Sequence, residues 1–284
     1  MKNKAGIEVF SGFGIAYPEY EVITPQTKQS YTIRALNVSE EEALKGSMIT
    51  PSKVARHLAE VLWKCIIKKP DNIKTFDDFI TKNTMKDRDA LLFGLYVSTY
   101  KGTQNFNVRC NNESCGFMNA VKIDIEKGLR AEFWNADEVI DKKTGNTKGS
   151  ILDYVKTVPL EVFKGVNCLI KSPTMKDEID VSESNNFTSD DIRNMQLSLT
   201  MVDKFTIEPN EKNPNGDQIL DRGNIYDAYN TLTPADRKLI ENAFDSEFNK
   251  YQIKIVSKVK CQKCGEMRDV EIDIAQQFFR SLFE

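Results

Sequence analysis

Apolar residues recur at helical spacing in several stretches of the chain, and a good helix-starting residue stands before each stretch. Thr84 and Thr233 are followed three residues later by Asp87 and Asp236, the spacing at which two side chains cap the first turn of a helix. Thr50 is followed by a proline, which suits the first helical position. The sequence therefore predicts helices that begin near Ser39, Thr50, Thr84 and Thr233.

Two other regions alternate between apolar and polar residues, which is the pattern of half-buried strands. Residues 105–109 and 120–125 form one pair of such stretches, and residues 252–260 and 270–274 form another. A short turn that contains two cysteines separates the members of each pair. We expect two β-hairpins, each with a cysteine turn at its tip.

The order of these elements repeats along the chain. Three pairs of segments match at one common offset of 149: residues 84–88 with 233–237, Cys115 with Cys264, and residues 121–125 with 270–274. A fainter match relates residues 33–41 to residues 170–178 at an offset of 137. Three features in the same order at one offset favour an internal duplication over chance similarity.

We therefore predict an α+β protein of two related halves, each built from a strand, helices and a cysteine β-hairpin, joined at a zinc-ribbon-like four-cysteine site. A chain of 284 residues is long enough for two modest domains. The predicted divisions are an N-terminal arm (1–30), a first repeat with its zinc-knuckle hairpin (31–125), a connector (126–165), and a second repeat with its zinc-knuckle hairpin and an aromatic C-terminal tail (166–284).

The cysteine turns have the spacing of zinc ligands. Cys110 and Cys115 are separated by four residues, and Cys261 and Cys264 by two. Zinc binds four thiolates tetrahedrally, and two tight turns that each present two thiolates supply such a set. A glycine directly follows the second cysteine of each turn, where the backbone often needs a left-handed conformation. The sequence predicts one structural Zn²⁺ held by Cys110, Cys115, Cys261 and Cys264.

Other interpretations of these cysteines stay open. Two reduced, metal-free turns and a Cys110–Cys115 disulfide are both compatible with the spacing. A redox dithiol at Cys261 and Cys264 is disfavoured, because this pair lies in a hairpin and not at the helix start that lowers a thiol pKa. A catalytic zinc is disfavoured as well, since four cysteines leave no open coordination position.

Composition narrows the class of function. Lysine and arginine number 39 against 42 aspartates and glutamates, a balance that does not favour nucleic-acid binding. No apolar run approaches the roughly 20 residues of a membrane-spanning helix, so we expect neither a membrane protein nor an exported one. His57 is the single histidine, and no phosphate-binding loop occurs. Cys65 and Cys168 stand in apolar runs and are interpreted as buried hydrophobic residues. We expect a protein that is not an enzyme.

Residues 84–96 (Thr-Met-Lys-Asp-Arg-Asp-Ala-Leu-Leu-Phe-Gly-Leu-Tyr), with the cysteine hairpin that follows, resemble the baseplate proteins of T-even-like tailed bacteriophages. Residues 23–25 and 31–42 resemble the same group, whose nearest family is that of the baseplate hub assembly proteins. The similarity is clearest over residues 20–125. It implies a protein of a contractile-tailed phage that acts in assembling the baseplate hub, as a component or as a transient chaperone. Such a protein works in the host cytoplasm during assembly or belongs to the tail baseplate of the virion.

The resulting hypothesis is a non-enzymatic structural or chaperone-like protein of a contractile phage tail baseplate, with a structural zinc ion and with other baseplate or tail proteins as partners. The alternative is a zinc-ribbon nucleic-acid-binding protein, suggested by Lys254, Lys258 and Lys260 on the second hairpin. Glu271 and Asp273 beside them, together with a net charge of −3, count against this alternative.

Overall fold

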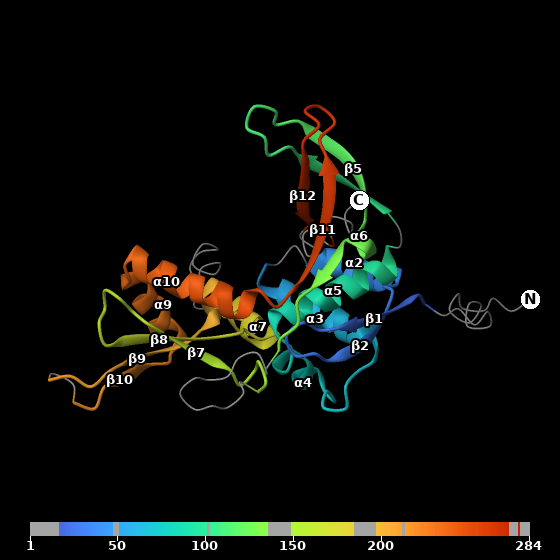
Figure 1. Cartoon of the computed structure of the whole chain (residues 1–284). Coiled ribbons are helices and arrows are strands. Elements are labelled where there is room, and N and C mark those ends of the chain that lie inside the picture. Colours follow the sequence, from blue (N-terminus) through green and yellow to red (C-terminus); the bar gives the residue numbers. More distant parts are fainter. Residues whose placement is uncertain are drawn as a thin grey trace, which may run out of the picture.

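The chain folds around two hydrophobic cores that lie side by side, each with an antiparallel sheet and helices packed against it (Figure 1). The computed structural model describes residues 17–47, 51–100, 103–135, 149–184, 197–211, 214–272 and residue 278. The mixture of helices and strands confirms the α+β class. None of the helices within these ranges is long and apolar enough to cross a membrane.

The first half consists of a three-stranded sheet, a group of helices and a projecting hairpin. The sheet order is β1-β2-β3, and all neighbours are antiparallel. Its elements are β1 (Glu19–Ile23), β2 (Ser30–Arg34), α2 (Val38–Ser47), α3 (Pro51–Cys65), β3 (Ile66–Lys68), α4 (Phe76–Thr81), α5 (Met85–Thr99), β4 (Thr103–Arg109) and β5 (Met118–Asp124). A short helix, α6 (Ile125–Gly128), and strand β6 (Leu129–Ala131) follow.

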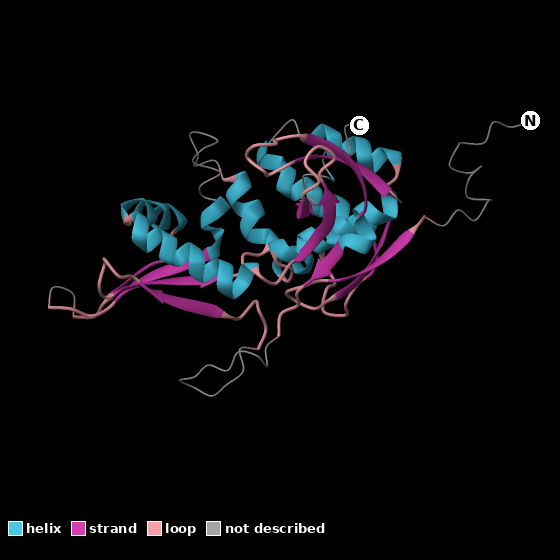
Figure 2. Cartoon of the chain, turned by 45° about the horizontal axis from the view of Figure 1, so that its top comes forward, coloured by secondary structure: helices cyan, strands magenta, loops and turns pink. Residues whose placement is uncertain are grey.

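The second half has a four-stranded sheet of order β10-β9-β8-β7. Helices α9 and α10 lie over one face of this sheet (Figure 2). Its elements are β7 (Val155–Pro159), β8 (Val166–Lys171), α7 (Met175–Glu183), a 3₁₀ turn (Leu199–Met201), β9 (Val202–Ile207), β10 (Asp217–Ile219), α9 (Arg222–Thr231), α10 (Pro234–Phe244), a π-helical turn (Asp245–Asn249), β11 (Ile253–Lys260) and β12 (Met267–Ile272). Strand β11 pairs with β12 and also with β6.

Both halves begin with a hairpin that the sequence did not predict. Strand β1 lies in the stretch expected to be an arm and pairs with β2, whereas β7 lies in the expected connector and pairs with β8. The two turns close alike: the Thr24 N–H donates to the Gln29 carbonyl at 2.9 Å, and the Leu160 N–H donates to the Val166 carbonyl at 3.0 Å. The elements common to both halves therefore include this additional hairpin. The domain boundaries given above remain a prediction.

The predicted caps of α5 and α10 are confirmed, and the aspartate of each cap also accepts hydrogen bonds from a neighbouring hairpin turn. Thr84 and Thr233 each accept the N–H of the aspartate three residues on, at 3.2 Å. Asp87 Oδ1 also accepts two main-chain N–H groups of the β1–β2 turn, the nearer at 2.9 Å. Asp236 Oδ1 accepts two from the β7–β8 turn, the nearer at 2.8 Å. In both halves a buried carboxylate therefore ties the capped helix to the first hairpin.

Ser39, the predicted capping residue of α2, is wrong by two residues, because the helix begins at Val38 and Asn37 caps it. Asn37 Oδ1 accepts the Glu40 N–H at 2.9 Å, and Glu40 Oε2 accepts the Asn37 N–H at 3.0 Å. Glu40 also forms an ion pair with Arg34 of β2 at 2.6 Å. This contact from the preceding strand selects Asn37 as the capping residue, and spacing within the helix does not reveal it.

The halves meet where the chain segments that open α5 and α7 run antiparallel to each other. The Met85 N–H donates to the Pro173 carbonyl at 2.9 Å, and the Met175 N–H donates to the Asn83 carbonyl at 3.0 Å. These two hydrogen bonds join the starts of two helices from different halves.

Side chains extend this junction on both sides of the main-chain pair. Arg88 of α5 forms an ion pair with Glu178 of α7. The Gln26 side chain, in the β1–β2 turn, donates to the Phe248 carbonyl at 3.0 Å and accepts a hydrogen bond from the Ser172 hydroxyl. Residues 24–26 of the β1–β2 turn are thus buried against the second half, whereas Lys28 of the same turn is exposed.

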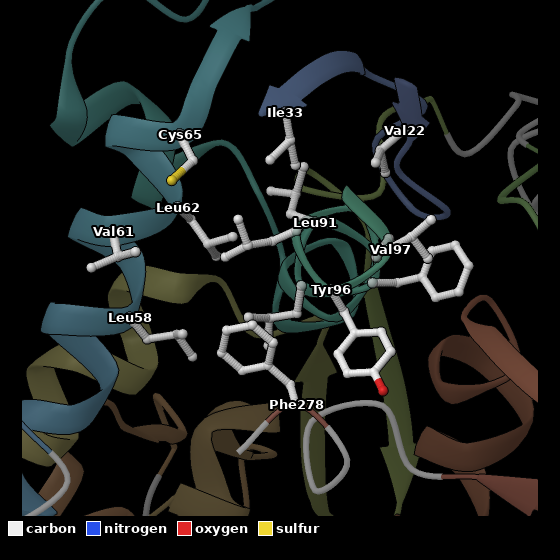
Figure 3. Packing of buried hydrophobic residues seen from close by; sticks show 14 of the residues in the cluster. Val22, Ile33, Leu58, Val61, Leu62, Cys65, Leu91, Tyr96, Val97 and Phe278 are labelled. Carbon is white, nitrogen blue, oxygen red and sulfur yellow. The ribbon is translucent and has the colours of Figure 1, made fainter. Parts of the chain in front are cut away.

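The first core contains residues that the second half contributes. Five of its buried members belong to that half: Met175, Ile179, Ile255, Val259 and Phe278. Phe278 is fully buried and packs near Leu58 and Tyr96 (Figure 3). Part of the predicted aromatic tail therefore belongs to the core; its other members, Phe279, Leu282 and Phe283, lie outside the described residues.

Candidate metal centre

The first cysteine turn stands at the end of a regular hairpin whose strands, β4 and β5, pair along their whole length. The Cys110 N–H donates to the Phe117 carbonyl at 2.8 Å and closes the turn. The N–H groups of Cys115 and Gly116 both donate to the Asn112 carbonyl, at 2.9 and 3.1 Å. Gly116 has a φ of +54°, a left-handed conformation that lets the chain return into β5.

The second cysteine turn is shorter and closes in the same way. The Cys261 N–H donates to the Glu266 carbonyl at 2.8 Å, and the Gly265 N–H donates to the Cys261 carbonyl at 2.9 Å. Gly265 has a φ of +76° and follows Cys264 directly, as Gly116 follows the second cysteine of the first turn. Two turns of different length therefore present their cysteines from equivalent positions.

The four sulfur atoms converge although they come from two separate sheets. The Sγ of Cys110 lies 3.7 Å from that of Cys264, and the Sγ of Cys115 lies 3.8 Å from that of Cys261. All four sulfurs lie within 4.8 Å of one another. A tetrahedral site with Zn–S bonds of about 2.3 Å has sulfur–sulfur edges of about 3.8 Å, whereas a disulfide bond is about 2.05 Å long. None of the four is in a disulfide, and together they could hold a metal ion.

The site is buried on one side and open on the other. Cys110 and Cys261, the first cysteine of each turn, are only 4% and 5% exposed, whereas Cys264 is exposed. Main-chain N–H donation from Cys264, supported by Lys263 and Asn119, lowers the pKa of the Cys261 thiol to about 6. A thiolate is the form that binds metal, and the lowered pKa favours this form at Cys261.

Asn119 of β5 links the two hairpins directly behind the sulfurs. Its side chain is 1% exposed, and its Nδ2 lies 3.6 Å from the Cys261 sulfur while it donates to the carbonyls of Val108 and Phe117. Its Oδ1 accepts the Gln262 N–H at 2.8 Å. A buried amide that contacts a ligand and the ligand's turn restricts where that ligand can move. Sequence reasoning missed this residue, because nothing in its spacing connects it to the second hairpin.

The remaining candidates from the sequence lie away from the four sulfurs. Cys65 and Cys168 are fully buried, as predicted, and burial raises the pKa of each thiol to about 12. Asp87 and Asp236 serve the helix caps and hairpin turns described above. The structure thus brings together the four predicted ligands and gives these other residues packing or capping roles.

A family model described as T4 bacteriophage base plate protein matches residues 17–280, a range that includes both halves and both cysteine hairpins. The chain has no significant match among curated proteins or among solved structures.

Proposed function

Because the chain belongs to the family of T4 bacteriophage base plate proteins, we propose that it is a structural or chaperone-like assembly protein of a contractile phage tail baseplate, without enzymatic activity. The match over residues 17–280 confirms the resemblance seen in residues 84–96 and extends it to nearly the whole chain. Under this proposal its partners are other baseplate or tail proteins. It works in the host cytoplasm during assembly or remains in the tail baseplate.

The proposal includes descent of the two halves from one duplicated unit. Both halves run through a hairpin, a capped helix, a third strand, a Thr-capped helix and a cysteine hairpin. Ion pairs correspond as well: Arg34 with Glu40 in the first half matches Lys171 with Asp177 in the second, at the offset of 137. Equivalent contacts between equivalent elements support common origin more strongly than shared letters do.

The observation that carries the function is the convergence of four sulfurs from hairpins 145 residues apart. We propose that they bind one structural Zn²⁺. Four thiolates fill a tetrahedral zinc site completely, so the ion would supply cross-linking and no open position for a substrate. Asn119 would hold Cys261 in position, and the glycines would keep both turns compact.

The proposed ion would act as a clip between the halves. The tip of each hairpin projects beyond the first core (Figure 1), and each tip would contribute two ligands. Without the ion, the tips of the hairpins are linked mainly through Asn119 and Gln262. With the ion bound, the two hairpin tips would be fixed relative to each other. An assembly partner could then bind them with a smaller loss of conformational entropy.

Metal content tests the clip. Native mass spectrometry of the purified protein should find one zinc ion per chain, and Cys261→Ser should lower the occupancy. Cys168→Ser is the matched control, because it changes a buried cysteine far from the four sulfurs and should leave occupancy intact. Structural zinc contributes apparent binding free energies on the order of 10 kcal/mol, so a chelator should visibly lower the thermal unfolding temperature. Full occupancy in Cys261→Ser would exclude a site shared by the two hairpins.

Phage genetics tests the assembly role independently of the metal. A nonsense mutation in the parent phage should give particles or tails that lack complete baseplates, and mass spectrometry should compare purified virions with infected-cell lysate. Presence in virions identifies a baseplate component, and presence in lysate alone identifies a transient assembly factor. Normal baseplates in the mutant would contradict both.

A further inference from the structure

The face of the first half that binds the second half has a counterpart that is left uncovered. In the first half this face consists of the β1–β2 turn (24–29), the start of α5 and Arg88. Ser172 and Phe248 contact the turn, Glu178 of α7 pairs with Arg88, and the body of α7 packs mainly on α3. The same elements of the second half are the β7–β8 turn (160–165), the start of α10 and Arg237, which we call the outer face. They lie at the end of the second half away from the first half (Figure 1).

Burial differs sharply between the two turns. Thr24 and Gln26 of the covered turn are 0% and 1% exposed. Val162 and Phe163 of the outer face are 57% and 39% exposed, so the second half presents apolar side chains where the first half presents a buried turn. Exposed apolar residues on a rigid turn are a common basis for protein contacts. Asp236 makes this turn rigid, because its carboxylate accepts two of the turn's N–H groups.

The arginines of the two faces differ in the same sense. Arg88 pairs with Glu178 of α7 and with Asp89. Arg237 occupies the equivalent position one residue after the capping aspartate, but no carboxylate pairs with it in the described part of the chain. Its Nε is buried without a hydrogen-bond partner, and its guanidinium lies 5.9 Å from the Tyr229 ring. A guanidinium without a carboxylate beside it leaves its charge available to an acidic partner.

We propose that the outer face binds a partner protein through an acidic helix start with the chemistry of α7. An apolar residue of the partner would cover Val162 and Phe163, and a carboxylate of its first helical turn would pair with Arg237. The internal junction supplies the template, since Met175 is buried there and Glu178 pairs with Arg88.

The contact would be weaker than the internal junction. Pro234 stands where the first half has Met85, and proline has no N–H to donate to a partner carbonyl. The partner would therefore be held mainly by side chains and could be released, as a contact made during assembly requires. This inference rests on the correspondence of the two halves and not on the metal ion.

A peptide that copies the internal occupant provides the probe. Fluorescently labelled peptide 172–184 would be titrated with the full-length protein and followed by anisotropy. The first half's own face is already covered, so binding would report the outer face. Arg237→Glu and Val162→Asp should each weaken binding at least about tenfold, which corresponds to about 1.4 kcal/mol. The controls are Lys238→Glu, an exposed cation next in sequence, and Leu220→Asp, an exposed apolar residue outside the face.

Charge exchange makes the test decisive. A peptide with Glu178→Lys should bind the wild type poorly and should bind Arg237→Glu better than the wild-type peptide does. Absence of binding, or equal binding by wild type and Arg237→Glu, would overturn the proposal. Sedimentation of the protein alone tests whether a second copy of the chain binds the outer face. If the protein self-associates and Val162→Asp abolishes this, the face binds a second copy and the proposed partner is wrong. Circular dichroism confirms that each variant is folded.

Discussion

The two cores differ in how much each depends on the other half. The first core includes five buried residues from the second half, whereas every described member of the second core lies between Trp134 and Tyr251. Similar elements in similar order have therefore produced one half that is nearly self-sufficient and one that is completed by its neighbour. In repeat architectures, stability is the sum of contributions from within each repeat and from the contacts between repeats. Here the contacts between the halves contribute mainly to the stability of the first half.

The largest expected effect tests this one-way dependence. Phe278→Ala should cost about 3–5 kcal/mol of unfolding free energy, because it empties a fully buried aromatic site. Native-state hydrogen exchange should then show lower protection in α3 and α5, with little change in α9 and α10. Phe248→Ala in the second core should lower protection in both halves. Phe163→Ala, at an exposed aromatic residue, is the control and should change protection little in either half. An equal loss of protection in both halves for Phe278→Ala would contradict the asymmetry.

The capping aspartates sharpen the comparison at single residues. Asp87→Asn should cost about 1–3 kcal/mol of unfolding free energy. The NH₂ group of the asparagine would replace the carboxylate oxygen that accepts the Thr84 N–H, so two buried donors would face each other without an acceptor. Asp236→Asn should cost less than about 1 kcal/mol, since the group it meets is the Thr233 hydroxyl, which can rotate and accept. Urea unfolding of the two variants measures the difference, and the opposite order would show that the two caps are not distinguished by these contacts.

The same two aspartates should respond to pH with opposite sign. Burial raises the pKa of Asp87, so the folded state binds more protons than the unfolded chain, and this group's contribution to stability falls as pH rises from the ordinary aspartate range to the raised pKa. Burial also acts on Asp236, but the N–H groups of Val162 and Glu161 outweigh it and lower its pKa. Its contribution is present above the ordinary range and is lost as pH falls.

Unfolding free energies of wild type and both variants across an acid pH series provide the check. The advantage of wild type over Asp236→Asn should shrink as pH falls, and its advantage over Asp87→Asn should grow. Parallel curves for the two variants would show that the carboxylates titrate alike despite their different surroundings.

Asn119 distinguishes the two cysteine hairpins, because its counterpart at the offset of 149 is Arg268. Under the proposed zinc site, Asn119→Ala should weaken zinc binding about 10- to 100-fold, the usual effect of removing a residue that orients a metal ligand. Competition with a chromogenic chelator measures the affinity. Asn107→Ala, an exposed amide on β4 of the same hairpin, is the matched control and should leave affinity unchanged. Equal affinity in both variants would remove Asn119 from the site.

The smallest effect concerns the two hairpin turns. Lys28 has a φ of +56°, and it precedes the residue that closes its turn, as Gly165 with a φ of +81° does in the second half. Lys28→Gly should raise stability by up to about 1 kcal/mol, because glycine adopts this conformation without the steric cost of a side chain. Gly165→Ala should lower it by about the same amount. Thermal unfolding measures both changes, and a loss in Lys28→Gly would mean that the lysine side chain contributes more than the backbone costs.

Local signals in the sequence were sufficient for part of this structure. The cysteine spacing identified four residues whose sulfur atoms do converge, and the Thr-x-x-Asp spacing identified the caps of α5 and α10. Both depend on residues a few positions apart, where chain geometry alone brings the groups together.

The remaining features depend on contacts between distant segments. Strands β1 and β7 are short, and each becomes recognisable only when its partner strand is known. Asn119 contacts Cys261, which lies 142 residues away in the chain. The junction has one signal in the sequence: residues 174–177 repeat the letters Thr-Met-Lys-Asp of residues 84–87, and these two segments pair with each other.

The separation of the two cysteine turns has a consequence during synthesis. The second pair of ligands follows the first by 145 residues, and ribosomes add about 5–20 residues per second. For roughly 7–30 s, the nascent chain would expose two thiols of an incomplete site, too few to retain zinc tightly. Under the proposed metal site, the ion would enter only after the second hairpin has emerged, and zinc binding would mark the chains in which both halves have been made.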